Sequence, residues 1–128
     1  MTNVRTILIV EDNPMNRDML SRRLAKRGYR ILTAEDGKSG VDIAIEQQPD
    51  MILMDINLPI MDGLEATRTL KNDPATKSIP IIGLTAHARV EDRDDAIKSG
   101  CDEYESKPVE FDRLIEKIET LFSLKKES

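Results

Sequence analysis

Short apolar runs that do not alternate with polar residues dominate the chain. Three are strong, at Ile7–Val10, Met51–Met54 and Ile81–Leu84, and a weaker one covers Ile31–Ala34. A continuous apolar run of this length is typical of a strand that is buried on both faces of its sheet. A fifth, more polar segment ends at Ser106. The pattern therefore predicts five strands.

The segments between these runs carry apolar residues at helical spacing. They predict five helices, over Pro14–Arg27, Lys38–Gln47, Asp62–Lys71, Arg89–Ser99 and Phe111–Phe122. Because strand and helix alternate five times, we expect an α/β fold in which helices cover both faces of a parallel sheet. We expect a single domain over residues 1–128, with flexible ends at 1–4 and 124–128.

Two of the predicted helices differ in the quality of their apolar stripes. The first follows Asn13, a favoured N-cap residue, and starts at Pro14, whose ring is preset to helical φ. Its expected stripe consists of Met15, Met19, Leu20 and Leu24. The fourth helix should pack weakly, since it has few apolar anchors among many charges. Those anchors are Val90, Ala96 and Ile97.

Composition and charge exclude several classes of protein. The 128 residues include 19 Lys+Arg, 24 Asp+Glu and one Cys, and the formal net charge is −5. This acidic balance argues against binding to a nucleic-acid backbone. No apolar run approaches the roughly 20 residues of a membrane span, and the N-terminus lacks the apolar segment of a signal peptide. With a single cysteine that cannot form an internal disulfide, we predict a soluble cytoplasmic domain without nucleic-acid or membrane partners.

One segment departs from the acidic average. Between Pro14 and Arg30, six basic residues accompany a single acidic one, Asp18, which gives a local net charge of +5. This segment could be an ordinary solvated helix face. It could also be a docking surface for an acidic partner.

Polar residues stand where the apolar runs end. Glu11 and Asp12 follow the first strong run, Asp55 the second and Thr85 the third, and Lys107 follows the fifth segment. Parallel strands place these ends along one edge, where open α/β sheets bind ligands. We therefore expect carboxylates, a hydroxyl and an ammonium group to converge there.

Three crowded carboxylates raise one another's pKa values unless a cation joins them. Oxygen ligands without His or thiolate suit Mg²⁺, with Mn²⁺ as a related ion, and Mg²⁺ typically shares its site with a phosphate. Glu11 could bind such an ion directly or through a water. Lys107 and Thr85 could bond the phosphate oxygens while a carboxylate attacks phosphorus, which yields an aspartyl phosphate.

At these residues the chain resembles the receiver domain of two-component response regulators, over essentially its whole length. The resemblance rests on four segments in order, Ile7–Asn13, Met54–Gly63, Leu84–Ala86 and Lys107–Pro108. Each segment alone is weakly specific, but all four at these separations are highly specific. The resemblance implies a flavodoxin-like fold with strand order 2-1-3-4-5, which is the order of flavodoxin and of the chemotaxis receiver. It also implies a cis peptide bond between Lys107 and Pro108.

The resemblance implies a role for each strand-end residue. Asp55 would be the phosphoacceptor, Thr85 the switch hydroxyl and Lys107 the cation that contacts the phosphoryl group. Tyr104 would be the aromatic side chain that reorients on activation. The implied Mg²⁺ ligands are Glu11, Asp12, Asp55 and the backbone carbonyl of Asn57.

The amino-acid sequences of two segments, Glu11–Arg17 and Leu84–Ala88, are similar to those of receivers in multistep phosphorelays and hybrid sensor kinases. It implies a phosphohistidine on a histidine kinase or histidine phosphotransfer protein as donor, and a downstream protein target as recipient of the signal. Such a domain is a switch without turnover of a separate substrate. In the family, the positions of Asn57 and His87 tune the lifetime of the phosphoryl group, although a solvated loop residue is the simpler interpretation of His87 itself.

The polar segment Asp102–Ser106 departs from the family pattern. Glu105 stands where receivers commonly carry an aliphatic residue. An edge strand can tolerate this charge on its open side.

Three alternatives remain beside a stand-alone receiver. The chain could be a receiver cut from a hybrid sensor kinase. It could be a phosphatase of the haloacid-dehalogenase type, but that class carries a second Asp as general acid where this chain has Asn57. A flavodoxin-like nucleotide domain would need a phosphate-cradling loop after the first strand, where this chain has Glu11–Pro14.

Overall fold

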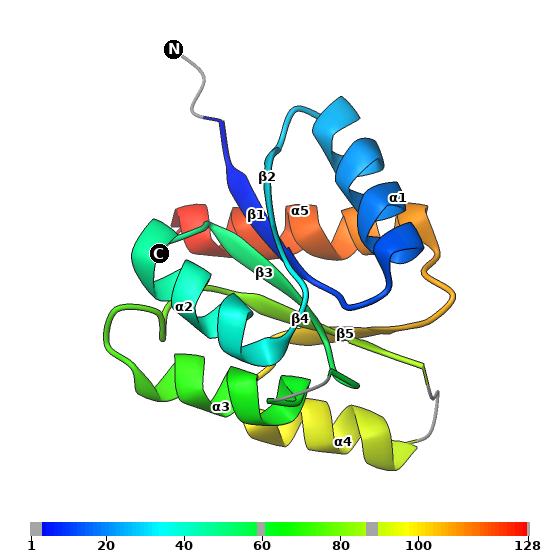
Figure 1. Cartoon of the computed structure of the whole chain (residues 1–128). Helices are drawn as coiled ribbons and strands as arrows, with labels where there is room; N and C mark the ends of the chain where they lie inside the picture. The colour runs from blue at the N-terminus through cyan, green and yellow to red at the C-terminus, as the bar shows by residue number, and fades with distance from the viewer. Residues whose placement is uncertain (1–3, 59–60, 87–89, 128) are drawn as a thin grey trace.

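Strands and helices alternate along the chain as the sequence predicts (Figure 1). The computed structural model describes residues 4–58, 61–86 and 90–127. The last helix continues beyond the predicted Phe122 to Glu127. In chain order, the elements are β1 (Thr6–Val10), α1 (Pro14–Lys26), β2 (Arg30–Ala34), α2 (Gly37–Gln47), β3 (Met51–Asp55), α3 (Gly63–Asn72), β4 (Ile81–Thr85), α4 (Val90–Ser99), β5 (Glu103–Ser106) and α5 (Phe111–Glu127).

The five strands form one parallel sheet in the order β2-β1-β3-β4-β5, which confirms the predicted flavodoxin-like topology. Helices α1 and α5 cover one face, and α2, α3 and α4 cover the other (Figure 1). In β1, Ile7 and Ile9 join the core under α1 and α5, whereas Leu8 and Val10 join the core under α2 and α3. Because both faces are covered, β1 and β3 are apolar at every position over Ile7–Val10 and Met51–Met54.

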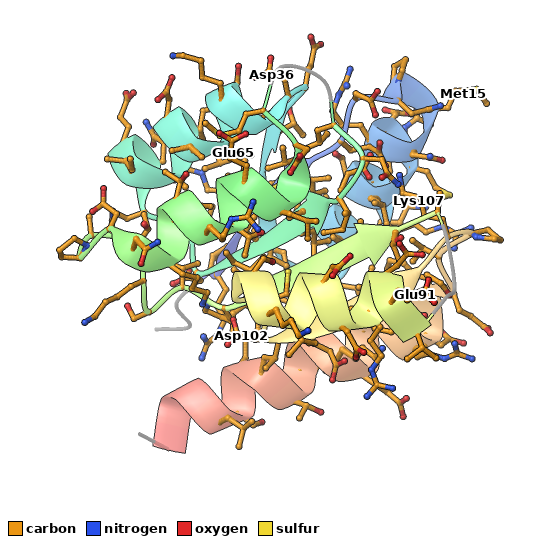
Figure 2. The ribbon with its side chains drawn as sticks, turned by 90° about the horizontal axis from the view of Figure 1, so that it is seen from below. Met15, Asp36, Glu65, Glu91, Asp102 and Lys107 are labelled. Carbon is orange, nitrogen blue, oxygen red and sulfur yellow. The ribbon has the colours of Figure 1, made fainter. Side chains whose placement is uncertain are left out.

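Helix α1 buries only the second half of its predicted stripe. Asn13 caps the helix as expected, since its Oδ1 accepts hydrogen bonds from the N–H groups of Met15 and Asn16 at 2.9 and 3.1 Å. Leu20 and Leu24 are buried in the core. Met15, however, is 81% exposed and Met19 is at the surface, so their predicted place in the core is wrong. The first turn of α1 lies beyond the end of β1, and Figure 2 shows Met15 at the periphery of the molecule.

Helix α4 packs through small residues rather than through its large apolar ones. Val90 and Ile97 are exposed, so their predicted role as anchors is wrong, whereas Ala96 is fully buried. Ala96 lies against Gly83 of β4, where a glycine leaves room for the helix to approach. The predicted weak apolar packing of this helix agrees with its buried set, which contains only Ala96 and Ser99 among its residues.

Glu105 of β5 is buried, so its predicted place on the open side of the edge strand is wrong. Its side chain faces α5 and is only 3% exposed. Two cations of α5 compensate the buried charge, with Lys117 Nζ 3.0 Å from Oε2 and an Arg113 guanidinium nitrogen 3.3 Å from Oε1. An ion-pair cluster of Glu105, Arg113 and Lys117 therefore occupies the place where receivers commonly carry an aliphatic side chain.

The main-chain N–H and carbonyl groups of Tyr104, on the outer edge of the sheet, form hydrogen bonds with charged side chains. Its N–H donates to the Glu103 carboxylate at 3.0 Å, and its carbonyl accepts from Lys117 Nζ at 2.5 Å. These bonds protect polar groups of an edge strand that would otherwise be free to pair with another chain. The Tyr104 side chain is half-buried against the core under α4.

Two further features bear on the fold. Cys101 is a buried free thiol beside Thr67. Within residues 4–58, 61–86 and 90–127, every helix falls short of the length and apolarity that a bilayer crossing requires.

Candidate functional site

The carboxyl ends of β1 and β3 lie side by side in the sheet. Val10 pairs with Met54, so the residues that follow them, Glu11 and Asp55, arrive together at the same edge. The strand register, which is set by the apolar residues, therefore places two carboxylates next to each other. This is the juxtaposition that the strand-end pattern predicts.

A cluster of three carboxylates occupies this edge. One oxygen from each of Glu11, Asp12 and Asp55 lies within 4.8 Å of the others. Glu11 is 0% and Asp55 2% exposed, whereas Asp12 is exposed. Two of the three charges are therefore removed from solvent, and the third lies at the opening of the site.

Lys107 brings a positive charge to the two buried carboxylates. Its Nζ lies 2.7 Å from Glu11 Oε1 and 3.1 Å from Asp55 Oδ2. The residue directly follows β5, and its N–H donates to the carbonyl of Thr85 at the end of β4. The peptide bond to Pro108 is cis, as predicted. The structure thus brings Lys107 to the place that the sequence predicts for it (Figure 2).

The buried groups alter one another's proton affinities. Burial raises the pKa of Asp55 to about 7, and the hydrogen bond and charge of Glu11 add to this shift. Burial also acts to raise the pKa of Glu11, but its hydrogen bonds with Asp55 and Lys107 outweigh this effect and leave that pKa below its usual value. Burial acts to lower the pKa of Lys107, but the two carboxylates raise it. Of the two buried carboxyl groups, Asp55 therefore binds a proton more readily than Glu11 does.

The donor set fits a divalent cation with a preference for oxygen. Three ionised carboxylates and one ammonium leave a formal charge of −2, which a divalent ion would neutralise. Mg²⁺ prefers this all-oxygen chemistry and completes its shell with waters and phosphate oxygens. Glu11, Asp12 and Asp55 can supply the side-chain ligands. Asn57 lies in the turn after β3, where its N–H donates to Asp55 Oδ1 at 3.0 Å.

Two of the other predicted residues, Thr85 and Tyr104, lie on the strands that follow β3 in the sheet. Thr85 is buried at the end of β4, the strand next to Asp55. Tyr104 lies one strand further, on β5. His87 lies outside the described residues, so its predicted role in tuning stays a prediction.

The structure also reveals Arg17 as a residue of the site, which sequence reasoning placed only in the basic segment. Its guanidinium donates to the main-chain carbonyl of Glu11 at 2.9 Å and lies 3.4 Å from Glu35. Arg17 therefore fixes the turn that carries Glu11 and Asp12. Its place one helical turn after the N-cap Asn13, and thus near the strand end, is the sequence signal that could have identified it.

Gly63 is a second residue whose importance becomes clear only in the structure. A Cβ at this position would lie 2.1 Å from the carbonyl oxygen of Asp55. The Gly63 N–H donates to the carbonyl of Ile56 at 2.9 Å, and Asp62 caps α3. Only glycine lets α3 begin this close to the end of β3. A glycine in the first turn of a predicted helix, where its propensity is poor, was the available signal.

Comparisons with known proteins identify the family to which the chain belongs. The family model described as response regulator receiver domain matches residues 7–119. The polar-differentiation response regulator DivK of Brucella anthropi is 39% identical over 116 residues, which make up 91% of this chain and 94% of that protein.

Solved structures of the same type superpose closely. The receiver domain of sensor histidine kinase PA1611 from Pseudomonas aeruginosa, which has a magnesium ion coordinated in its active-site cleft, gives a TM-score of 0.86 at 36% identity, over 92% of this chain and 97% of that chain. The receiver domain of Ssk1 from Saccharomyces cerevisiae, solved in complex with the histidine phosphotransfer protein Ypd1, gives a TM-score of 0.83 at 30% identity, over 92% of this chain and 88% of that chain. The protein therefore belongs to the response regulator receiver domain family of two-component signalling.

Proposed function

We propose that Asp55 accepts a phosphoryl group from a phosphohistidine in a Mg²⁺-dependent reaction. The observation that carries this proposal is the convergence of three carboxylates and Lys107 at one sheet edge, with Asp55 at its centre. A phosphoryl transfer needs positioning and charge neutralisation more than covalent chemistry from the protein. The cluster supplies both.

In the proposed step, a carboxylate oxygen of Asp55 attacks phosphorus and forms the new P–O bond. The P–N bond to the donor imidazole breaks, and its electron pair stays on the imidazole nitrogen. Lys107 and the Thr85 hydroxyl stabilise the transferring oxygens. A Mg²⁺ ion held by Glu11, Asp12, Asp55 and the Asn57 carbonyl would neutralise the carboxylates and bind a phosphoryl oxygen.

A surface beside the cluster supports a protein as phosphodonor. A cavity of about 250 Å³ lies between α1 and the segment after β5. It continues from Glu11 and Lys107 to the apolar side chains of Met19 and Val109. The donor would be a histidine kinase or a histidine phosphotransfer protein, the class of partner that is bound to the similar Ssk1 receiver.

The phosphorylated protein would signal by contact with a downstream protein rather than by turning over a substrate. Thr85 and Tyr104 would carry the change from the site towards β5, while Asn57 and His87 would set the lifetime of the aspartyl phosphate. We propose that the chain acts as a single-domain regulator, which its match to 94% of the length of DivK supports. The mass of the native protein distinguishes this from a receiver within a hybrid kinase.

Phosphorylation of the purified chain tests the proposal. With a small phosphodonor and Mg²⁺, intact-mass measurement should show one added phosphoryl group on the wild type and none on Asp55→Asn. Asp42→Asn is the matched control, since Asp42 is an exposed carboxylate that pairs with Lys38 on α2. Equal phosphorylation of Asp55→Asn and the wild type would overturn the proposal, as would full phosphorylation in excess EDTA.

A further inference from the structure

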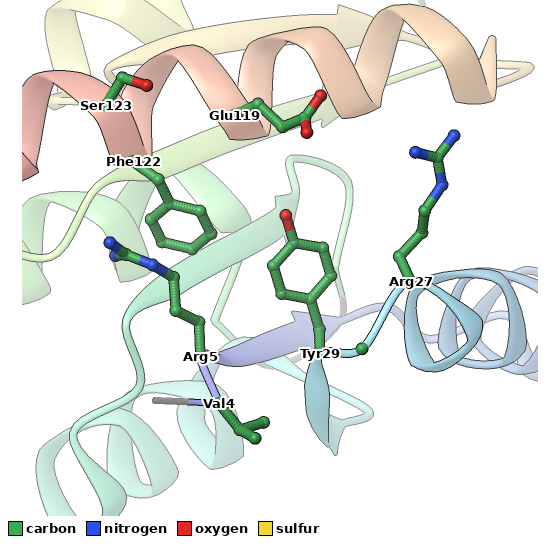
Figure 3. Close-up of a pocket in the computed structure, with 8 residues that line it drawn as sticks. Val4, Arg5, Arg27, Tyr29, Glu119, Phe122 and Ser123 are labelled. Atoms are coloured by element: carbon green, nitrogen blue, oxygen red, sulfur yellow. The ribbon is translucent and has the colours of Figure 1, made fainter. Parts of the chain in front are cut away.

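A cavity of about 430 Å³ lies at the edge of the sheet opposite Asp55. Its walls are Arg5, which precedes β1, the turn Arg27–Tyr29, which precedes β2, and the segment Glu119–Ser123 of α5 (Figure 3). Since all strands are parallel, the cavity is at their amino ends, whereas the carboxylate cluster is at their carboxyl ends. Its volume falls within the range of small-molecule sites, roughly 300–1,000 Å³.

Two arginines of this cavity have guanidinium groups without an anionic partner. Neither Arg5 nor Arg27 makes a side-chain hydrogen bond or an ion pair with any residue that the structure describes. Instead, the Arg5 guanidinium lies over the ring of Phe122, 4.3 Å from its centre, and that of Arg27 lies 5.9 Å from the ring centre of Phe111. The aromatic contacts orient both groups and leave their N–H donors available to an anion.

An aromatic surface connects the two arginines. The rings of Tyr29 and Phe122 lie 5.9 Å apart with 37° between their planes. Figure 3 shows Tyr29 between Arg5 and Arg27, with its hydroxyl directed towards α5 and Glu119. Burial and the Glu119 charge raise the pKa of Tyr29, and both arginines oppose this shift. Arg5, Arg27 and Glu119 line the same cavity as Tyr29, and their charges act on its phenol.

We propose that this cavity is a binding site for a nucleoside monophosphate. The base would stack on the half-buried ring of Tyr29 and on the guanidinium plane of Arg5, since Phe122 is buried beneath that guanidinium. The phosphate would accept hydrogen bonds from the guanidinium groups, which match its geometry. Glu119 would accept a hydrogen bond from an amino group on the base.

This site is separate from the phosphorylation reaction. None of its lining residues belongs to the carboxylate cluster, so a ligand here would not compete with Mg²⁺ or with a phosphodonor. A protein partner fits the cavity less well than a small molecule does, since specific protein interfaces bury about 800 Å² on each side and the walls here come from three short segments. A ligand would instead link β1, β2 and α5 at the base of the sheet.

A titration of the ¹⁵N-labelled chain followed by NMR tests the proposal, with adenosine monophosphate as the probe. Binding should shift the amide resonances of Arg27–Tyr29 and Glu119–Ser123. Adenosine and inorganic phosphate, each tested alone, should bind at least about tenfold more weakly, because each lacks one of the two recognition elements. Phosphate that binds as tightly as the nucleotide would overturn the proposal and would leave a simple anion site.

Matched arginine variants make the test specific. Arg27→Gln should weaken binding of adenosine monophosphate about tenfold, the loss expected for one charge-assisted contact. Arg22→Gln should leave it unchanged, since Arg22 is an exposed α1 residue that pairs with Asp18 and does not line the cavity. Preserved spectra away from the cavity would show that both variants fold. Equal weakening by both variants, or no shift in the wild type, would contradict the proposal.

The base contact has its own test. Inosine monophosphate carries a carbonyl where adenosine monophosphate carries an amino group, so it should bind the wild type more weakly than adenosine monophosphate. In Glu119→Gln this preference should shrink. Equal binding of the two nucleotides to the wild type would contradict the assigned role of Glu119.

Discussion

Glu11 and Lys107 form an ion pair of 2.7 Å although 96 residues separate them in the sequence. They follow β1 and β5, which are not neighbours in the sheet, so the lysine side chain spans the ends of the strands between them. Because Asp55 lies 3.1 Å from the same ammonium, one cation links the first, third and fifth strands. The site and the fold are therefore coupled through Lys107.

Removal of this ammonium should destabilise the protein. Lys107→Met should lower the free energy of unfolding by about 2 kcal/mol at neutral pH, because Glu11 and Asp55 remain buried without their cation. The loss should be smaller than for a fully buried pair, since the Lys107 side chain is 19% exposed. Urea denaturation measures it, and Lys26→Met, which removes an exposed lysine of α1, is the control. Equal stability of the two variants would contradict the role of Lys107.

Asp55→Asn should make the protein more stable in the absence of divalent cations. The pKa of Asp55 is raised from 3.8 to about 7, so its ionisation disfavours the folded state. The stabilisation that protonated Asp55 contributes to the folded state is greatest below pH 3.8 and is lost as the pH rises to about 7. The advantage of Asp55→Asn over the wild type should therefore grow across this interval, by on the order of 4 kcal/mol, and level off above it.

Denaturation in EDTA at several pH values measures this advantage. The opposite trend, with Asp55→Asn losing its advantage as the pH rises, would mean that Asp55 ionises more readily in the folded protein than in the unfolded chain.

The buried ion pair between Glu105 and Lys117 gives a prediction about packing. Lys117→Met alone should cost about 2 kcal/mol, because Glu105 stays buried with only Arg113 as its cation. The double variant Glu105→Leu/Lys117→Met should recover most of this loss, since an apolar pair can replace a buried ion pair of similar volume. Thermal unfolding of the single and double variants measures the coupling. Additive losses would show that Glu105 does not depend on Lys117.

Gly63 should tolerate no side chain, in contrast to Gly28. Gly63→Ala should cost about 3 kcal/mol or more, because its Cβ would meet the Asp55 carbonyl oxygen at 2.1 Å. Gly28 has a φ of +95°, but a Cβ there would have no other atom within 4 Å, so Gly28→Ala should cost only the backbone strain, about 1–2 kcal/mol. Denaturation of both variants compares the two effects. A smaller loss at Gly63 than at Gly28 would contradict the close approach of α3 to β3.

The sequence was sufficient to predict the sheet and the polar residues that meet at its carboxyl edge. Buried parallel strands are apolar at every position, so Ile7–Val10 and Met51–Met54 were recognisable without a structure. The same strands fix where Glu11 and Asp55 emerge, because the end of an apolar run marks the end of the strand. The strand order and the cis peptide before Pro108 came from the family resemblance rather than from the pattern.

Other features depend on contacts that a one-dimensional pattern does not contain. Met15 fits the helical stripe of α1, but the sheet does not extend beneath the first turn of that helix. Glu105 was expected at an open edge because the sequence of β5 alone does not show its cations. These cations, Arg113 and Lys117, come from the next helix and allow the carboxylate to be buried. Arg17 looked like one charge of a basic segment, although it holds the Glu11 carbonyl. In each case, contacts that form only in the folded chain determine the position of the side chain.

Thermal unfolding with and without Mg²⁺, at an ionic strength matched with NaCl, tests most directly whether the carboxylate cluster is a cation site. Asp12→Asn removes an exposed carboxylate of the cluster without disturbing the core, and Asp18→Asn removes an exposed carboxylate outside the cluster. Mg²⁺ should stabilise the wild type and Asp18→Asn, by about 2.7 kcal/mol at 100 times the dissociation constant, and Asp12→Asn much less. Equal stabilisation of all three proteins, or none of the wild type at millimolar Mg²⁺, would contradict the account.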